Sequence, residues 1–320
     1  MTIDGVRPAR GRRSAPAGPR GAAPRSSLAR HVASDFARLR AQLEGAARRV
    51  RREHDREAAH DLRVATRRLA SALDVWGGLL DDHATQRARR RLRSLRRSAG
   101  LLRDTEVARE LLVRLAGSLS HLPRLAVEDL ARRVELRIAR RAGPAARDSR
   151  RARIRRALRD VERALEPLAH PIGTAAARAH ADAQVDALER NARSAVGAAL
   201  RSRDDDDALH AARIAVKRWR YGVERLQILD RPSGPAAARH ATAVAEARAI
   251  QRGLGLLHDL AGARDLITRR IGRLLERERR AEAEALQEAL PTIVREREAP
   301  LLELQRLVTT RSGTARLRVV

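Results

Sequence analysis

One block of sequence occurs twice in this chain, and this duplication limits the possible folds more than any other feature. Residues 60–70 read HDLRVATRRLA and residues 210–220 read HAARIAVKRWR, so a histidine, an arginine, an alanine and two basic residues recur 150 positions later. A second block, GLLRDTEVARELL at 100–112, recurs as GLLHDLAGARDLI at 255–267, which is 155 positions later. Two blocks in the same order at nearly the same spacing indicate two copies of one structural unit.

The periodicity of the repeated unit is helical. Ala, Leu, Arg and Glu dominate the chain, and these residues lose little side-chain freedom in a helix. From Leu28 onward no stretch alternates apolar and polar residues over the length of a strand. Breaks are predicted near Gly77-Gly78, Gly143-Pro144, Pro167 to Gly173, Pro232 to Pro235 and Pro291. The sequence therefore predicts an all-α fold of about ten antiparallel helices and no sheet.

The composition of the ends divides the chain into three parts. Residues 1–26 are rich in Pro, Gly, Ala and Arg without periodicity, which predicts a disordered basic tail. Residues 27–310 form the predicted helical domain, with the first repeat at about 27–167 and the second at about 174–310. Residues 311–320 are interpreted as a C-terminal tail.

The charge of the chain points to a polyanionic partner. The formal net charge is +28, and all of the basic residues except Lys217 are arginine. A guanidinium group binds phosphate oxygens in a bidentate geometry that an ammonium group cannot reproduce. A codon bias toward arginine would give the same composition, so charge alone does not identify the polyanion.

The absence of cysteine and of long apolar segments excludes two classes of site and indicates where the protein is located. The chain has no cysteine, which excludes a disulfide framework and a thiolate metal site. No apolar run approaches the roughly 20 residues that span a bilayer, and the N-terminus lacks the apolar core of a secretory signal. We therefore expect a cytoplasmic protein without a membrane partner.

The first repeated block places cations in a stripe along a helix. At about 100° per residue, the four side chains of the second copy share a stripe about 80° wide, apart from the apolar face. They are His210, Arg213, Lys217 and Arg220, and acids at 204–207 precede them at the expected helix start. The first copy has His60, Arg63 and Arg67, with Ala70 in place of the fourth cation. An exposed arginine-rich face is the alternative, but it would have to occur twice at matched positions.

The second repeated block adds cations at matched positions. Arg93 and Arg97 stand 155 residues before Arg248 and Arg252, and Arg103 matches His258. We hypothesise that both halves direct these side chains at one shared pocket. No catalytic residue, metal ligand or cofactor is predicted, because no metal-ligand spacing and no phosphate-binding glycine loop is present.

With these motifs, the chain resembles the CHAD family, the conserved-histidine α-helical domain. The resemblance rests on His60-x-x-Arg63-Val64-x-x-Arg67-Arg68, on His210-x-x-Arg213-Ile214-x-x-Lys217-Arg218-x-Arg220-Tyr221, and on the two Gly-Leu-Leu-x-Asp segments. It covers residues 28 to 308 or so. It implies two similar antiparallel helical-bundle repeats with a pseudo-two-fold relation around a basic central cavity, and binding of inorganic polyphosphate. Ala70 departs from the usual pattern at one contact.

Three functions are compatible with these features. The first is non-catalytic binding of inorganic polyphosphate, which requires dense cations and no base recognition, with polyphosphate granules as a corresponding location. The second is non-specific nucleic-acid binding at low salt, although only four aromatic residues are present and both tryptophans are predicted to face the core. The third is an enzyme acting on phosphate esters, which we do not predict, because no acid is placed to assist His60 or His210.

Overall fold

The computed structural model is all-α. It describes residues 27–52, 56–141, 145–169, 174–229 and 234–316, and it describes side chains in 28–49, 60–96, 106–137, 152–167, 175–229 and 234–309. Ten α-helices occupy this described part of the chain, with no strand. They are α1 (Ser27–Arg52), α2 (Arg56–Trp76), α3 (Asp82–Ala116), α4 (His121–Arg141), α5 (Ala145–Leu165), α6 (Thr174–Arg201), α7 (Asp206–Leu226), α8 (Pro235–Leu275), α9 (Arg280–Gln287) and α10 (Leu290–Arg316).

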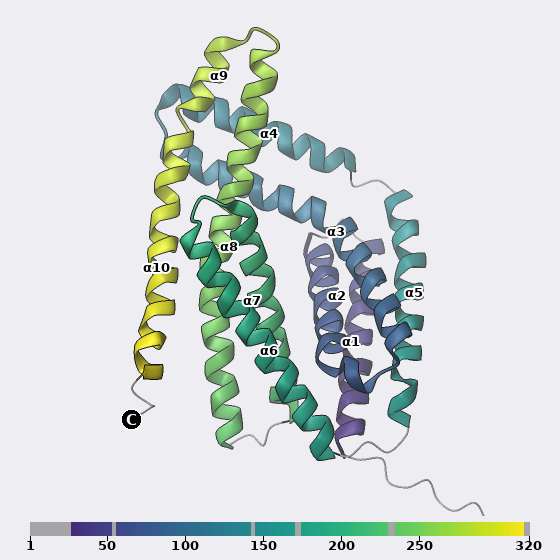
Figure 1. The fold of residues 1–320 in the computed structure, drawn as a ribbon. Coiled ribbons are helices and arrows are strands. Elements are labelled where there is room, and N and C mark those ends of the chain that lie inside the picture. Colours follow the sequence, from purple (N-terminus) through teal and green to yellow (C-terminus); the bar gives the residue numbers. More distant parts are fainter. Residues whose placement is uncertain (1–26, 53–55, 142–144, 170–173, 230–233, 317–320) are drawn as a thin grey trace, which may run out of the picture.

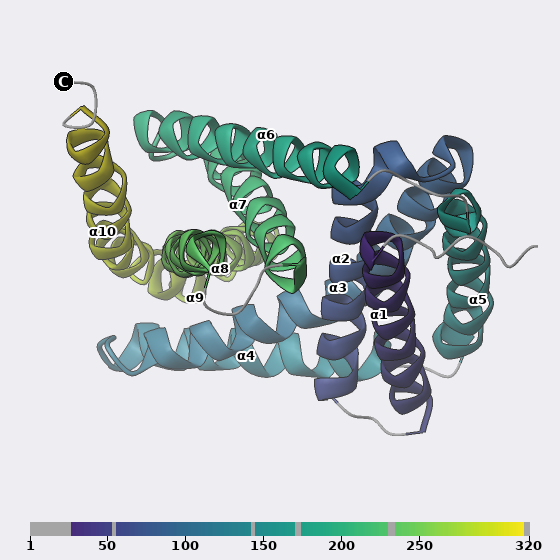
Figure 2. The same ribbon diagram turned by 90° about the horizontal axis from the view of Figure 1, so that it is seen from below.

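Most helices of the first sequence half lie beside one another, whereas α4 lies against α8 and α9 of the second half (Figure 2). Helices α1, α2 and α5 are on one side, and α6, α8 and α10 are on the other (Figure 2). Helices of equal rank in the two halves contact each other, namely α2 with α7, α3 with α8 and α4 with α9. The long helices α3 and α8 cross the middle of the molecule (Figure 1). The two-fold relation between repeats and the central cavity remain predictions.

Two apolar clusters hold these helices together. The larger contains residues of α1, α2, α5, α6 and α7 with the N-terminal parts of α3 and α8, including Phe36, Trp76 and Trp219. The smaller joins the C-terminal parts of α3 and α8 to α4 and α9, with Leu112, Leu130 and Ile267 among its members. Each cluster draws residues from both sequence halves, so neither half buries its apolar face alone.

A buried ion pair also joins the two halves. Arg225 of α7 donates from Nη1 to both carboxylate oxygens of Asp35 of α1, at 2.8 and 3.0 Å. Both side chains are almost fully buried, and removing one partner of such a pair typically costs about 3–5 kcal/mol. Arg38, three residues from Asp35, binds the same carboxylate. This contact fixes α7 against the first helix of the chain.

Most predicted breaks fall where the helices end. A 3₁₀ turn at Gly77–Leu79 follows α2, another at Glu166–Ala169 follows α5, and α8 begins at Pro235. The predicted break at Pro291 lies one residue inside α10, since proline is tolerated in the first turn of a helix. Gly143 and Pro144 lie outside the described residues, as does the predicted tail of residues 1–26.

The last helix reaches further than the predicted domain. Helix α10 ends at Arg316, six residues beyond the boundary that the sequence placed at 310. Gly313 lies inside this helix, where a glycine costs only about 1 kcal/mol relative to alanine. No helix in the described part of the chain is both long and apolar enough to cross a bilayer.

Two glycines of α8 test how tightly α8 packs against α10. A Cβ added at Gly253 would stand 2.9 Å from Leu304 Cγ of α10, whereas one at Gly255 would meet nothing within 4 Å. We expect Gly255→Ala to raise the free energy of unfolding by about 0.5–1 kcal/mol through helix propensity. Gly253→Ala gains the same propensity but overpacks the core, which costs about 1–3 kcal/mol.

Chemical denaturation of both variants measures these changes. The pair is matched because both substitutions add one methyl group to the same helix. Equal stabilisation by the two alanines would contradict the close approach of α8 and α10.

Candidate functional site

Helix α2 holds the first cationic stripe by burying its opposite face. Leu62, Leu69, Leu73 and Trp76 are buried in the larger apolar cluster. His60 is exposed, and Arg63 and Arg67 are partly buried, so the stripe borders the core and remains in contact with solvent. The helical spacing that the sequence predicted for these three residues is therefore confirmed by the position of the buried face.

Helix α7 holds the second stripe and begins at an acidic cap. The Asp205 carboxylate accepts hydrogen bonds from the backbone N–H groups of Asp207 and Ala208, each at 3.0 Å. Asp206 in the first turn binds Arg264 of α8 and, at 2.8 Å, the buried Arg297 of α10. The acids before the stripe thus fix the start of α7 against two neighbouring helices.

The two stripes meet where α2 packs against α7. Arg67 Nη1 donates to the Tyr221 hydroxyl at 3.4 Å, which links α2 to α7 directly. Nearby, Arg218 Nη2 of α7 lies 3.1 Å from Asp74 Oδ2 of α2. Asp74 also binds Arg89 of α3 at 3.0 Å, so one carboxylate holds cations from two helices.

Lys217 shows how closely the cations of both halves gather. Burial and the charges of Arg213, Arg67 and Arg63 together lower the pKa of the Lys217 ammonium to about 6, against the opposing effect of Asp259. Two of these arginines belong to α2 and one to α7, while Asp259 belongs to α8. The four cations form one group, which we call the basic cluster.

Arg96 of α3 belongs beside the basic cluster, although the sequence did not point to it. Burial lowers the pKa of its guanidinium group, and the charges of Arg67, Arg93, Arg63 and Arg218 act in the same direction. This brings the predicted residue Arg93 to the same region. The repeat comparison passed over Arg96 because the residue 155 positions later is Gln251.

His210 and His258 form a contact pair at the edge of the second stripe. Their Nδ1 atoms are 3.3 Å apart, and their ring centroids are 4.8 Å apart. At that distance one nitrogen donates and the other accepts, so at most one of the two facing nitrogens carries a proton. The structure therefore brings His258 of α8 to the stripe of α7, as the sequence predicted.

The remaining cations of the second half are partly neutralised. Glu224 Oε1 lies 3.7 Å from Arg220 Nε and 3.3 Å from Arg248 Nη2. The guanidinium of Arg220 also lies over the ring of Tyr221, with 4.3 Å between its carbon and the ring centroid. Arg252 is exposed on α8, one turn after Arg248.

The structure does not describe the side chains of two residues that the sequence predicted for the site. Arg97 and Arg103 are within α3, but their side chains lie outside the described residues. Among the described side chains, no group of three or more His, Asp or Glu residues is arranged to hold a metal ion. The chemistry that the described site offers is a concentration of cationic hydrogen-bond donors.

Comparisons with known proteins identify the fold. The family model described as "CHAD domain" matches residues 34–268. A crystal structure of the CHAD domain from the plant Ricinus communis is similar, with 22% identity, a TM-score of 0.64, and coverage of 88% of this chain and 91% of that one. PptA from Streptomyces chartreusis has 18% identity, a TM-score of 0.59, and coverage of 87% and 98%. At these identities the likeness is evidence of the fold alone. No curated protein matches the sequence.

Replacing Lys217 tests the crowding of the cations. Its pKa is lowered in the folded protein, so between pH 6 and about 10.5 the unfolded chain holds more protons at this site. Lys217 therefore lowers the free energy of unfolding by an amount that grows as the pH falls from about 10.5 to 6. Below pH 6 this amount is constant. We expect Lys217→Met to be more stable than the original chain, by a margin that shrinks as the pH rises from 6.5 to 9.5.

Urea denaturation of both chains at several pH values measures this margin. A margin that is constant with pH, or a destabilised variant, would show that Lys217 is an ordinary solvated lysine.

Proposed function

Because the chain belongs to the CHAD domain family, we propose that it binds inorganic polyphosphate, and that it does so without catalysis. The observation that supports this most is the basic cluster, in which burial and the charges of Arg213, Arg67 and Arg63 lower the pKa of the Lys217 ammonium to about 6. A chain of phosphates would relieve that repulsion, because each phosphate brings a negative charge and several acceptor oxygens. The ligand thus adds negative charge beside the basic cluster.

We assign the first contact residues to the basic cluster and to the stripe of α2. His60, Arg63, Arg67, Arg213 and Lys217 would contact the polymer first. Arg220 and Arg248, which share Glu224, and the residues around them would contact it further along the chain. This second set comprises Arg93, Arg97, Arg103, His210, Arg252 and His258.

Nucleic acid is the alternative ligand, and the aromatic residues argue against a dedicated role. A protein that binds single strands usually stacks bases on exposed aromatic rings, each worth about 1–3 kcal/mol. The four aromatic residues of this chain, Phe36, Trp76, Trp219 and Tyr221, are all buried. We therefore expect nucleic acid to bind through charge alone, at low salt and without sequence preference.

The proposal that the protein is not an enzyme rests on the composition of the site. Phosphoryl transfer usually requires a metal held by carboxylates or an activated nucleophile. Of the carboxylates around the basic cluster, Asp74 and Glu224 are bound to arginines, and Asp259 acts on Lys217. A cytoplasmic location beside polyphosphate granules would suit a binding protein of this kind.

Substitution of Arg213 tests the proposed site. We expect Arg213→Ala to weaken polyphosphate binding by about 10-fold or more at 150 mM salt, since a charge-assisted contact contributes about 1.5–3 kcal/mol. Its control is Arg155→Ala, which removes the same charge from an exposed position of α5. Titration calorimetry with polyphosphate measures both affinities, and equal losses in the two variants would show that only the total charge counts.

The affinity should also depend on pH. A bound phosphate raises the pKa of Lys217 from about 6, so binding takes up protons near neutral pH. Histidine protonation acts in the same direction, so we expect tighter binding at pH 6 than at pH 8, at fixed ionic strength. Lys217→Arg carries a permanent charge and should show a weaker dependence. An affinity that is flat with pH in the original chain would contradict these contacts.

Competition distinguishes the two ligand classes. Filter binding of labelled polyphosphate is measured with unlabelled polyphosphate, duplex DNA or RNA at equal phosphate concentration and 150 mM salt. We expect only polyphosphate to compete efficiently. Displacement by duplex DNA or RNA at equal phosphate would favour the nucleic-acid alternative.

A further inference from the structure

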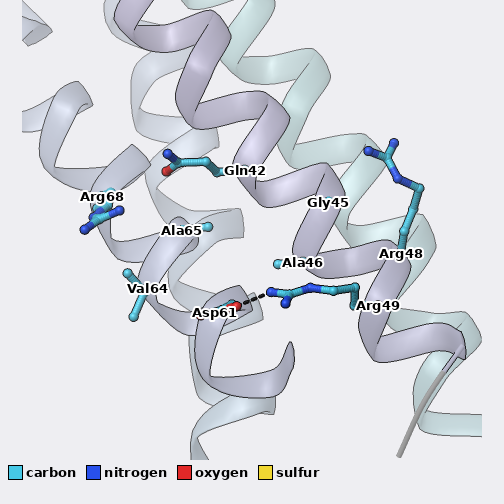
Figure 3. Close-up of a pocket in the computed structure, with 9 residues that line it drawn as sticks. All are labelled: Gln42, Gly45, Ala46, Arg48, Arg49, Asp61, Val64, Ala65 and Arg68. Atoms are coloured by element: carbon cyan, nitrogen blue, oxygen red, sulfur yellow. Dashed lines mark hydrogen bonds and ion pairs between the residues drawn. The ribbon is translucent and has the colours of Figure 1, made fainter. Parts of the chain in front are cut away.

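A pocket lies between α1 and α2, on the first helical hairpin of the molecule. Its volume is about 600 Å³, within the range of small-molecule sites. Gln42 extends from α1 across the gap toward α2, and an ion pair between Arg49 and Asp61 joins the helices at the other end (Figure 3). The described lining residues are Gln42, Gly45, Ala46, Arg48, Arg49, Asp61, Val64, Ala65 and Arg68.

This pocket is separate from the basic cluster. Its residues on α2 lie about 40–140° around the helix from His60, whereas Arg63 and Arg67 lie at about 300° and 340°. The other wall comes from α1, which contributes nothing to the basic cluster. A ligand in this pocket would therefore lie on a different face of α2 from the polyphosphate.

Arg68 is the side chain that most requires a ligand. Its Nε atom is buried and has no hydrogen-bond partner among the described residues. At the matched position 150 residues later, Arg218 donates from Nε and Nη2 to Asp74, at 3.3 and 3.1 Å. Burying a donor without a partner destabilises the fold, so an anion at Arg68 would remove that penalty.

The rest of the lining determines what kind of anion fits. Arg48 adds a second cation at the rim, while Asp61 neutralises Arg49. The wall between them is apolar, formed by Ala46, Val64 and Ala65. Gln42 offers both a donor and an acceptor, which matches the edge of a nucleobase.

From this lining, we propose that the pocket between α1 and α2 binds a nucleoside phosphate. Its phosphates lie against Arg68, and its base lies over the apolar wall within reach of Gln42 (Figure 3). Polyphosphate has no apolar group to contact the wall of Ala46, Val64 and Ala65. The pocket therefore selects organic phosphates over polyphosphate.

Binding of adenosine diphosphate to the full chain tests this site. Titration calorimetry at 150 mM salt should give one bound molecule per chain. Arg68→Gln should weaken the affinity by about 10-fold or more, since it removes the charge-assisted contact. Gly45→Leu should weaken it similarly, because a Cβ at Gly45 meets nothing within 4 Å and the added side chain occupies the pocket.

Two controls make the result specific. Gly272→Leu adds the same side chain to an exposed glycine of α8, where an added Cβ also meets nothing within 4 Å, and should bind like the original chain. Arg213→Ala should also bind adenosine diphosphate normally, even where it loses polyphosphate, so this test does not depend on the proposed function. Circular dichroism establishes whether each variant is folded. If Gly45→Leu does not fold, the result for Arg68→Gln alone decides whether the pocket binds adenosine diphosphate.

Three outcomes would overturn the proposal. One is adenosine diphosphate binding that neither Arg68→Gln nor Gly45→Leu changes. The second is an absence of binding at millimolar concentration. The third is competition by pyrophosphate as strong as that by unlabelled adenosine diphosphate, which would show that the nucleoside contributes nothing.

Discussion

Repulsion among cations is the constraint on which the rest of this structure depends. Where α2 and α7 meet, Arg63, Arg67, Arg213 and Lys217 stand close enough to lower the pKa of the lysine to about 6, together with its burial. Within the group, Arg67 donates to the Tyr221 hydroxyl, and the charge of Asp259 opposes the repulsion at Lys217. Two apolar clusters that each draw on both sequence halves, and the buried pair of Arg225 and Asp35, force the helices into contact despite the repulsion.

Acids at the edge of this region form ion pairs with arginines of neighbouring helices. Asp74 binds arginines of α3 and α7, and Glu224 binds arginines of α7 and α8. These two acids stand 150 residues apart, the same spacing as His60 and His210. Each fixes the orientation of guanidinium groups around the edge of the basic cluster. A site arranged in this way suits a long anion with no other chemical feature to recognise.

The sequence predicted the helical class and the basic stripes, because both follow from residue type and helical spacing alone. Arg67 and Lys217 were placed on facing stripes, and their charges do interact. Arg96 was missed because its counterpart is Gln251, so repetition gave no signal, and only packing brings it to Arg67. The ion pairs of Asp35 and Asp74 were equally hidden, since they join residues 190 and 144 positions apart.

Lys217 permits the most direct test, because it is the only lysine in the chain. Isotopic labelling of lysine gives a single side-chain resonance, whose titration can be followed by NMR with and without polyphosphate. Convergence of the two stripes on one polyanion site predicts a pKa near 6 in the free protein and a rise of more than one unit on binding. A pKa near the ordinary value of about 10.4 in the free protein, unchanged by the polymer, would contradict the account.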